Sequence, residues 1–174
     1  MTPELKRTAY HEAGHAFIAW RQHLRIKRAT IKPHGERLGS VEHPKLVSAQ
    51  ESRDLEANAE ITSYVRDKLE KHIRVSLAGW EAERRFTADP SWAMTDLGNA
   101  LDDMMRLAGS QREMDLYLAL LRYQTKEMLR SGWPHVKALA AALLERETLR
   151  GNEIVAVIHT SMGIPQLEAD DLGG

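Results

Sequence analysis

The chain has 174 residues, of which 43% are hydrophobic and 28% are charged, a composition typical of one globular domain. Its formal net charge of −1 excludes a strong overall field that would attract nucleic acid or an anionic membrane surface. Cysteine is absent, which excludes disulfides and thiolate zinc sites, and no signal peptide or membrane-spanning run is found, so we expect a cytoplasmic protein.

The first predicted element is a helix from Pro3 to about Gln22. Proline suits the first helical turn, and Thr2 has the side chain of an N-cap. Apolar residues recur at helical spacing, at Leu5, Ala9, Ala13, Ala16, Phe17 and Trp20. The segment from residue 11 to residue 15 is therefore expected to lie well inside a helix.

That segment reads His11-Glu12-Ala13-Gly14-His15. Two histidines four residues apart lie on one helical face, so both imidazoles can reach a single Zn²⁺ ion. Glu12 can approach a water at that metal without filling a ligand position, which is the general base's place in H-E-x-x-H zinc peptidases. The alternative interpretation is a pair of surface histidines beside a solvated carboxylate. Because the glutamate and the flanking residues also fit the peptidase pattern, we predict that His11 and His15 bind zinc and that Glu12 is catalytic.

The rest of the chain is predicted to be mostly helical, with a small β element after the first helix. A strand over Arg28–Lys32 ends at Pro33, and a glycine-containing turn leads to a second short strand over Ser40–His43. Apolar periodicity then predicts helices at about Ser48–Phe86, Thr95–Gly109, Arg112–Arg130, Pro134–Glu147 and Asn152–His159. The predicted fold is mainly α with a small β-hairpin or sheet element, in one domain over residues 1–166 followed by an acidic, flexible tail over 167–174.

A catalytic zinc ion usually has three protein ligands, so the motif leaves one ligand to find. A continuation to H-E-x-x-H-x-x-G-x-x-H is excluded, because Ile18 and Arg21 occupy the glycine and final histidine positions. Glu81 or Glu83 could supply a carboxylate from a following helix, and Asp96 could supply one from the start of a later helix. By its position alone, Asp96 is better explained as a helix N-cap.

Several segments resemble the peptidase domain of FtsH-type proteases, the M41 family. The resemblance extends from Thr8 to Ile158 and is carried by Thr8–Ala16, by Ala29–Pro33 with Leu38-Gly39, by Leu77–Glu83, by Thr95-Asp96-Leu97 and by Leu139–Ile154. It implies a zincin-like FtsH peptidase-domain fold and a hexameric ring. It also implies that Asp96 is the third zinc ligand and that Thr30–Lys32 is an edge strand that pairs with an extended substrate.

The 174 residues differ from that family in containing neither membrane helices nor an ATPase module with its Gly-x-x-x-x-Gly-Lys-Ser/Thr phosphate loop. We therefore predict a zinc metalloendopeptidase that hydrolyses unfolded or flexible polypeptides without an ATPase in cis. One alternative is a non-catalytic peptide-binding module that keeps a structural zinc site, suggested by the altered segment over Asp89–Met94. Another is a peptidase subunit that assembles with an AAA ATPase in trans.

Overall fold

The computed structural model describes residues 2–33, 38–56, 60–87 and 94–164. The tail predicted over 167–174 and the altered segment before Asp96 lie outside these described residues, apart from the helical backbone of residue 94. In chain order the elements are α1 (Pro3–Arg21), β1 (Arg28–Thr30), β2 (Ser40–Glu42), α2 (Ala49–Glu56), α3 (Ser63–Phe86), α4 (Met94–Leu107), α5 (Gln111–Ser131), α6 (Trp133–Arg146), β3 (Thr148–Arg150) and α7 (Gly151–Ser161). The predicted class, mainly α with a small sheet, is confirmed.

The long helix predicted over Ser48–Phe86 is two helices, α2 and α3. Thr62 begins α3, because its backbone is extended and its hydroxyl accepts a hydrogen bond from the Val65 N–H at 3.3 Å. Such a side chain satisfies one of the donors that every helix start leaves unpaired. The apolar periodicity continues across this break, which is why periodicity alone did not locate it.

The sheet is antiparallel and has the strand order β2-β1-β3. β1 is the central strand, and its Thr30 pairs with Ser40 on one side and with Thr148 on the other. The prediction that Thr30 lies in an edge strand is therefore wrong. The cause is β3, which the sequence pattern did not reveal: Glu147 adopts a left-handed backbone conformation (φ 61°) after α6 and turns the chain back onto β1.

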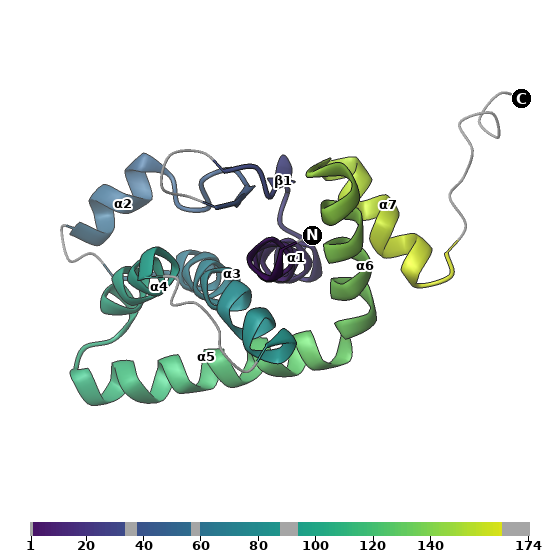
Figure 1. Ribbon diagram of the computed structural model, residues 1–174. Helices are drawn as coiled ribbons and strands as arrows, with labels where there is room; N and C mark the ends of the chain where they lie inside the picture. Colours follow the sequence, from purple (N-terminus) through teal and green to yellow (C-terminus); the bar gives the residue numbers. More distant parts are fainter. Residues whose placement is uncertain (1, 34–37, 57–59, 88–93, 165–174) are drawn as a thin grey trace, which may run out of the picture.

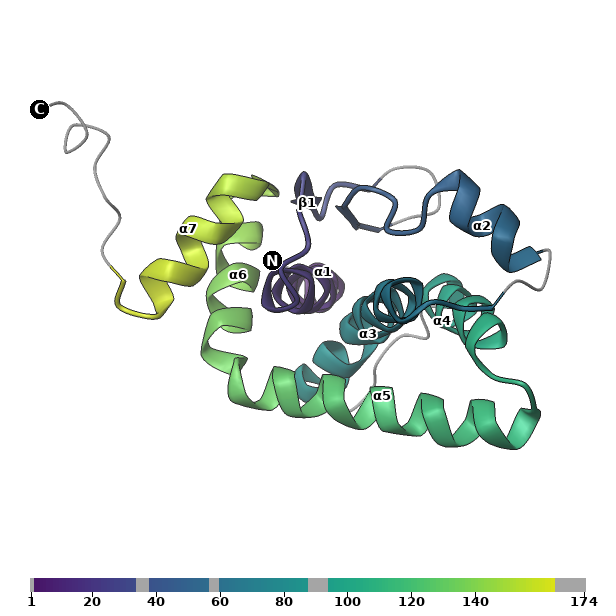
Figure 2. The same ribbon diagram turned by 180° about the vertical axis from the view of Figure 1, so that it is seen from behind.

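Helix α1 lies at the centre of the molecule, with α3 on one side, α6 on the other and the sheet across a third face (Figure 1). Its buried face consists largely of small residues, which allow the neighbouring helices to approach closely: Ala9, Ala13, Ala16 and Ala19. A second apolar cluster joins α3, α4 and α5, and α5 runs along this side of the molecule (Figure 2). Among the described residues, no helix has both the length and the apolar composition that a membrane crossing requires.

Candidate metal centre

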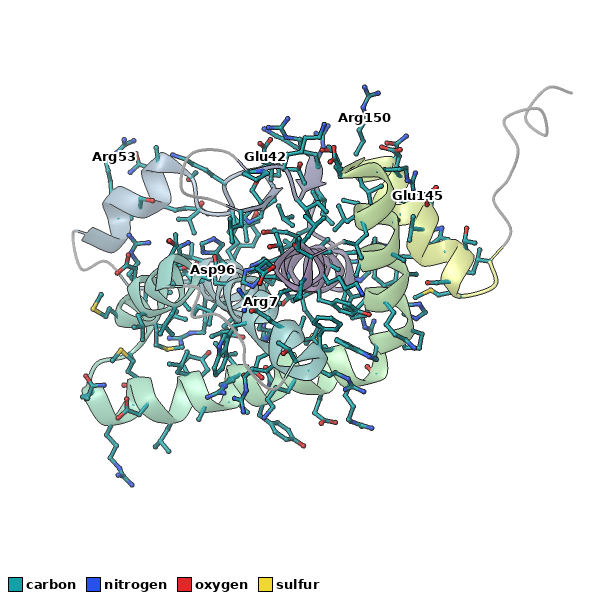
Figure 3. All side chains as sticks on the ribbon, viewed as in Figure 1. Arg7, Glu42, Arg53, Asp96, Glu145 and Arg150 are labelled. Atoms are coloured by element: carbon teal, nitrogen blue, oxygen red, sulfur yellow. The ribbon has the colours of Figure 1, made fainter. Side chains whose placement is uncertain are left out.

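The two motif histidines meet one aspartate between α1 and α4. The Nε2 atoms of His11 and His15 lie 3.0 Å apart, and the rings meet edge to face with centroids 4.7 Å apart. Asp96, in the first turn of α4, reaches toward α1 (Figure 3) and places Oδ2 2.9 Å from His11 Nε2 and 3.3 Å from His15 Nε2. The three residues thus offer ligand atoms that all lie within 4.8 Å of one another.

The second ring nitrogen of each histidine, Nδ1, lies within hydrogen-bonding distance of an acceptor oxygen. His15 Nδ1 lies 2.6 Å from the carbonyl oxygen of Val75, and His11 Nδ1 lies 3.2 Å from Glu83 Oε2. We assign a proton to each Nδ1, because a carbonyl and a carboxylate can only accept a hydrogen bond. Both Nε2 atoms then face the space between the rings, and metal-binding histidines are typically oriented in this way.

Two further residues support this arrangement. Arg7 Nε lies 3.2 Å from the second oxygen of Glu83, whose side chain is almost completely buried. Gly79 on α3 faces the two rings so closely that a Cβ there would lie 2.4 Å from His15 Nε2 and 2.5 Å from His11 Nε2. Because glycine has a hydrogen in place of a Cβ, residue 79 leaves room for the two imidazoles.

The local charges favour a cation at this point. Burial lowers the pKa of His11, but the carboxylates of Asp96 and Glu83 outweigh that effect and raise it to about 10. Burial likewise raises the pKa of Asp96, but His15 and His11 outweigh it and hold the pKa far below its usual range. The site therefore stabilises a positive charge beside Asp96.

The donor set and its spacing fit Zn²⁺. Ligand atoms about 2.0–2.2 Å from a tetrahedral zinc ion stand roughly 3.3 Å from each other. The three separations among the Nε2 atoms and Asp96 Oδ2 are 2.9, 3.0 and 3.3 Å, close to that value. Two imidazoles and one carboxylate also leave a fourth position for water, as in catalytic rather than structural zinc sites.

Glu12 lies next to His11 in sequence, and its carboxylate contributes to the raised pKa of His11. The Glu12 side chain is buried where α1 meets the start of β2. A Cβ at Gly39 would lie 2.7 Å from Glu12 Oε1 and 2.8 Å from the Thr30 carbonyl oxygen, so the carboxylate lies beside the β1–β2 pair. Glu12 thus lies next to the candidate ligand His11 in sequence and against strand backbone.

No established family profile matches the chain. It is 30% identical to the ATP-dependent zinc metalloprotease FtsH 1 of Symbiobacterium thermophilum, over 90% of this chain and 29% of that protein. It is 31% identical to the ATP-dependent zinc metalloprotease FTSH 9, chloroplastic/mitochondrial, of Oryza sativa subsp. japonica, over 94% of this chain and 23% of that protein. It is 27% identical to the ATP-dependent zinc metalloprotease FtsH of Marinobacter nauticus, over 91% of this chain and 30% of that protein.

The chain is a homologue of the FtsH zinc metalloproteases. The resemblance predicted from the sequence motifs is thereby confirmed. This FtsH homologue matches less than a third of the length of each of these relatives. Its helical fold with a three-stranded sheet is consistent with a peptidase-domain fold.

The structure of this FtsH homologue separates the three carboxylates considered for the third ligand position. Asp96 joins the histidines, Glu83 lies behind His11, and Glu81 forms an ion pair with Arg122 of α5. Asp96 lies inside the first turn of α4 rather than ahead of it, which disfavours the N-cap interpretation. Sequence reasoning missed Arg7, although its spacing of four residues before His11 placed the two on one helical face.

Proposed function

We propose that this chain is a zinc-dependent endopeptidase that hydrolyses unfolded or flexible polypeptides. The observation that carries the proposal is the convergence of His11, His15 and Asp96 at one point, with the buried Glu12 carboxylate next to it in sequence. The relatives' names, zinc metalloproteases, support zinc-dependent proteolysis.

In this proposal His11, His15 and Asp96 hold Zn²⁺. When bound, the ion supplies Lewis-acid polarisation of the scissile carbonyl and makes a water molecule more acidic. Glu83 and the Val75 carbonyl keep the two imidazoles in the tautomer and orientation that ligation requires.

Glu12 acts as the proton carrier. Its carboxylate accepts a proton from the attacking water and delivers it to the nitrogen of the leaving amine. Burial beside the β1–β2 pair restricts the side chain to a few rotamers, so the carboxylate is positioned before the substrate arrives.

The test is cleavage of casein, an unfolded protein, by the 174-residue chain with zinc and without ATP. Glu12→Gln should lower the rate by about 100-fold or more, because general-base catalysis contributes roughly that much. It should leave the zinc content unchanged. Glu4→Gln is the matched control, since it removes an exposed carboxylate from the same helix and should retain full activity.

Two outcomes would contradict parts of the proposal. Full activity in Glu12→Gln would remove Glu12 from the mechanism. Casein binding without cleavage by the wild type would instead indicate a peptide-binding module that retains zinc.

A second candidate is a peptidase that works with a separate AAA ATPase. It is favoured by the relatives, which are named ATP-dependent and are matched over only 23–31% of their length. Cleavage of a folded substrate that appears only when an ATPase and ATP are added would support it. Light scattering of the purified chain would show whether it forms the hexamer that the resemblance implies.

A further inference from the structure

A second pair of histidines shares no residue with the metal centre, although His15 acts electrostatically on one member, His43. His72 is on α3, and His43 directly follows β2. Their rings meet edge to face, with centroids 5.6 Å apart and planes at 76°. The corresponding values for His11 and His15 are 4.7 Å and 74°, so both pairs meet edge to face and the second pair is more widely spaced.

Both rings of the second pair are anchored through Nδ1. His72 Nδ1 contacts Asp103 Oδ2, and Asp103 is buried and also accepts a hydrogen bond from Arg106 at 3.2 Å. His43 Nδ1 lies 3.0 Å from the Pro44 carbonyl oxygen. Because these partners accept, the protons belong on Nδ1, and each Nε2 carries the lone pair that a metal ion requires.

The position in the fold repeats that of the first site. His72 precedes Gly79 by two turns of α3, and Asp103 follows Asp96 by two turns of α4. Two imidazoles that share a tetrahedral zinc ion have ring centroids roughly 5 Å apart, given Zn–N bonds of about 2.0–2.1 Å. The spacing of 5.6 Å between His43 and His72 is within reach of that geometry.

We propose that His43 and His72 form a second divalent metal site, suited to Zn²⁺ or a similar borderline cation. The pair provides two nitrogen ligands, and water completes the coordination shell. The described residues contain one convergent group of three metal-ligating side chains, His11, His15 and Asp96, so the second site is the weaker one.

The experiment counts zinc ions bound per chain by equilibrium dialysis against rising free Zn²⁺, with metal measured by mass spectrometry. The wild type should bind two ions, the second more weakly. His72→Gln and His43→Gln should each bind one. In His72→Gln the side-chain amide can still donate a hydrogen bond to Asp103, so the fold should persist. Retention of the zinc ion at the first site would verify that the variant is folded.

The matched control is His23→Asn, which removes an exposed histidine at a left-handed position that asparagine tolerates and should leave two ions bound. A single ion in the wild type, or a second ion that survives in both His72→Gln and His43→Gln, would overturn the proposal. His15→Gln should lose the first ion and keep the second. The outcome is therefore independent of whether the chain is a peptidase.

Discussion

The two histidine pairs share their ring geometry and differ in what surrounds it. His11 and His15 come from one rigid helix turn, and Asp96 meets both on the Nε2 side. His43 and His72 come from a loop and a helix, and the nearby carboxylate, Asp103, lies on the Nδ1 side instead. A carboxylate on the Nε2 side, such as Asp96, is placed to be a third ligand, whereas a carboxylate on the Nδ1 side, such as Asp103, is placed to orient the ring.

The largest expected difference between the pairs comes from Asp96→Asn. This change removes a ligand charge from the first site only, and we expect its zinc affinity to fall by more than about 100-fold, beyond the effect of losing an orienting partner. Affinity at the second site should not change. Competition with a zinc chelator measures both, and Asp102→Asn, an exposed change on the same helix, is the control. An unchanged first affinity would remove Asp96 from the ligand set.

Gly79→Ala should give the next largest effect. Its methyl group would overlap both Nε2 atoms of the first pair, and we expect about a 100-fold loss of zinc affinity there. Gly98→Ala is the matched control, because no atom lies within 4 Å of a Cβ at that position of α4. That control should keep full affinity and gain about 0.5–1 kcal/mol of helix stability. Equal zinc affinity in the two variants would contradict the close approach at Gly79.

Glu83→Gln and Asp103→Asn test the orienting carboxylates of the two pairs. Each should weaken its own site by about 10- to 100-fold and leave the other unaffected. Zinc titrations of each variant, with circular dichroism to verify folding, measure the effects. A loss at both sites from either change would mean that the two pairs are coupled through α3.

The smallest expected difference is in pH dependence. The pKa of His11 is raised from 6.5 to about 10, so at neutral pH zinc must displace a proton, and first-site affinity should rise about tenfold per pH unit below that pKa. The stability of the metal-free chain depends on pH in the opposite direction. The stabilisation that protonated His11 gives the fold is complete below its unfolded-state pKa and is lost as pH rises toward 10. His43, whose pKa is lowered, should release no proton at pH 7. Calorimetry in two buffers of different ionisation enthalpy counts these protons.

Sequence reasoning predicted most of the fold because helices carry strong periodic signals. The confirmed class and the bounds of α1 and α5 follow from apolar spacing, and for α1 also from the capping residue Thr2. The three-residue strand β3 gave no such signal, since its pairing with β1 depends on long-range contacts that a local pattern does not encode.

Some residues of the candidate site could be predicted from local sequence and others could not, for a related reason. The spacing of His11 and His15 is local, so the motif alone predicted a shared metal. The choice of Asp96 needed the family resemblance, because its distance from α1 depends on how α3 and α4 pack. The Val75 carbonyl and the Gly79 hydrogen contribute to the site without any functional side chain. A pattern of residue types therefore could not predict their roles.

The pairing of Ala29 with Leu149 has a consequence for biosynthesis. Within the described residues α1 is translated before α6 and β3, which complete its surroundings. Until then part of the alanine-rich face of α1 lacks its cover, so the incomplete chain exposes apolar surface of the kind that makes folding intermediates prone to aggregate. We expect the helix that bears the His11–His15 motif to be translated well before the elements that fix it in place.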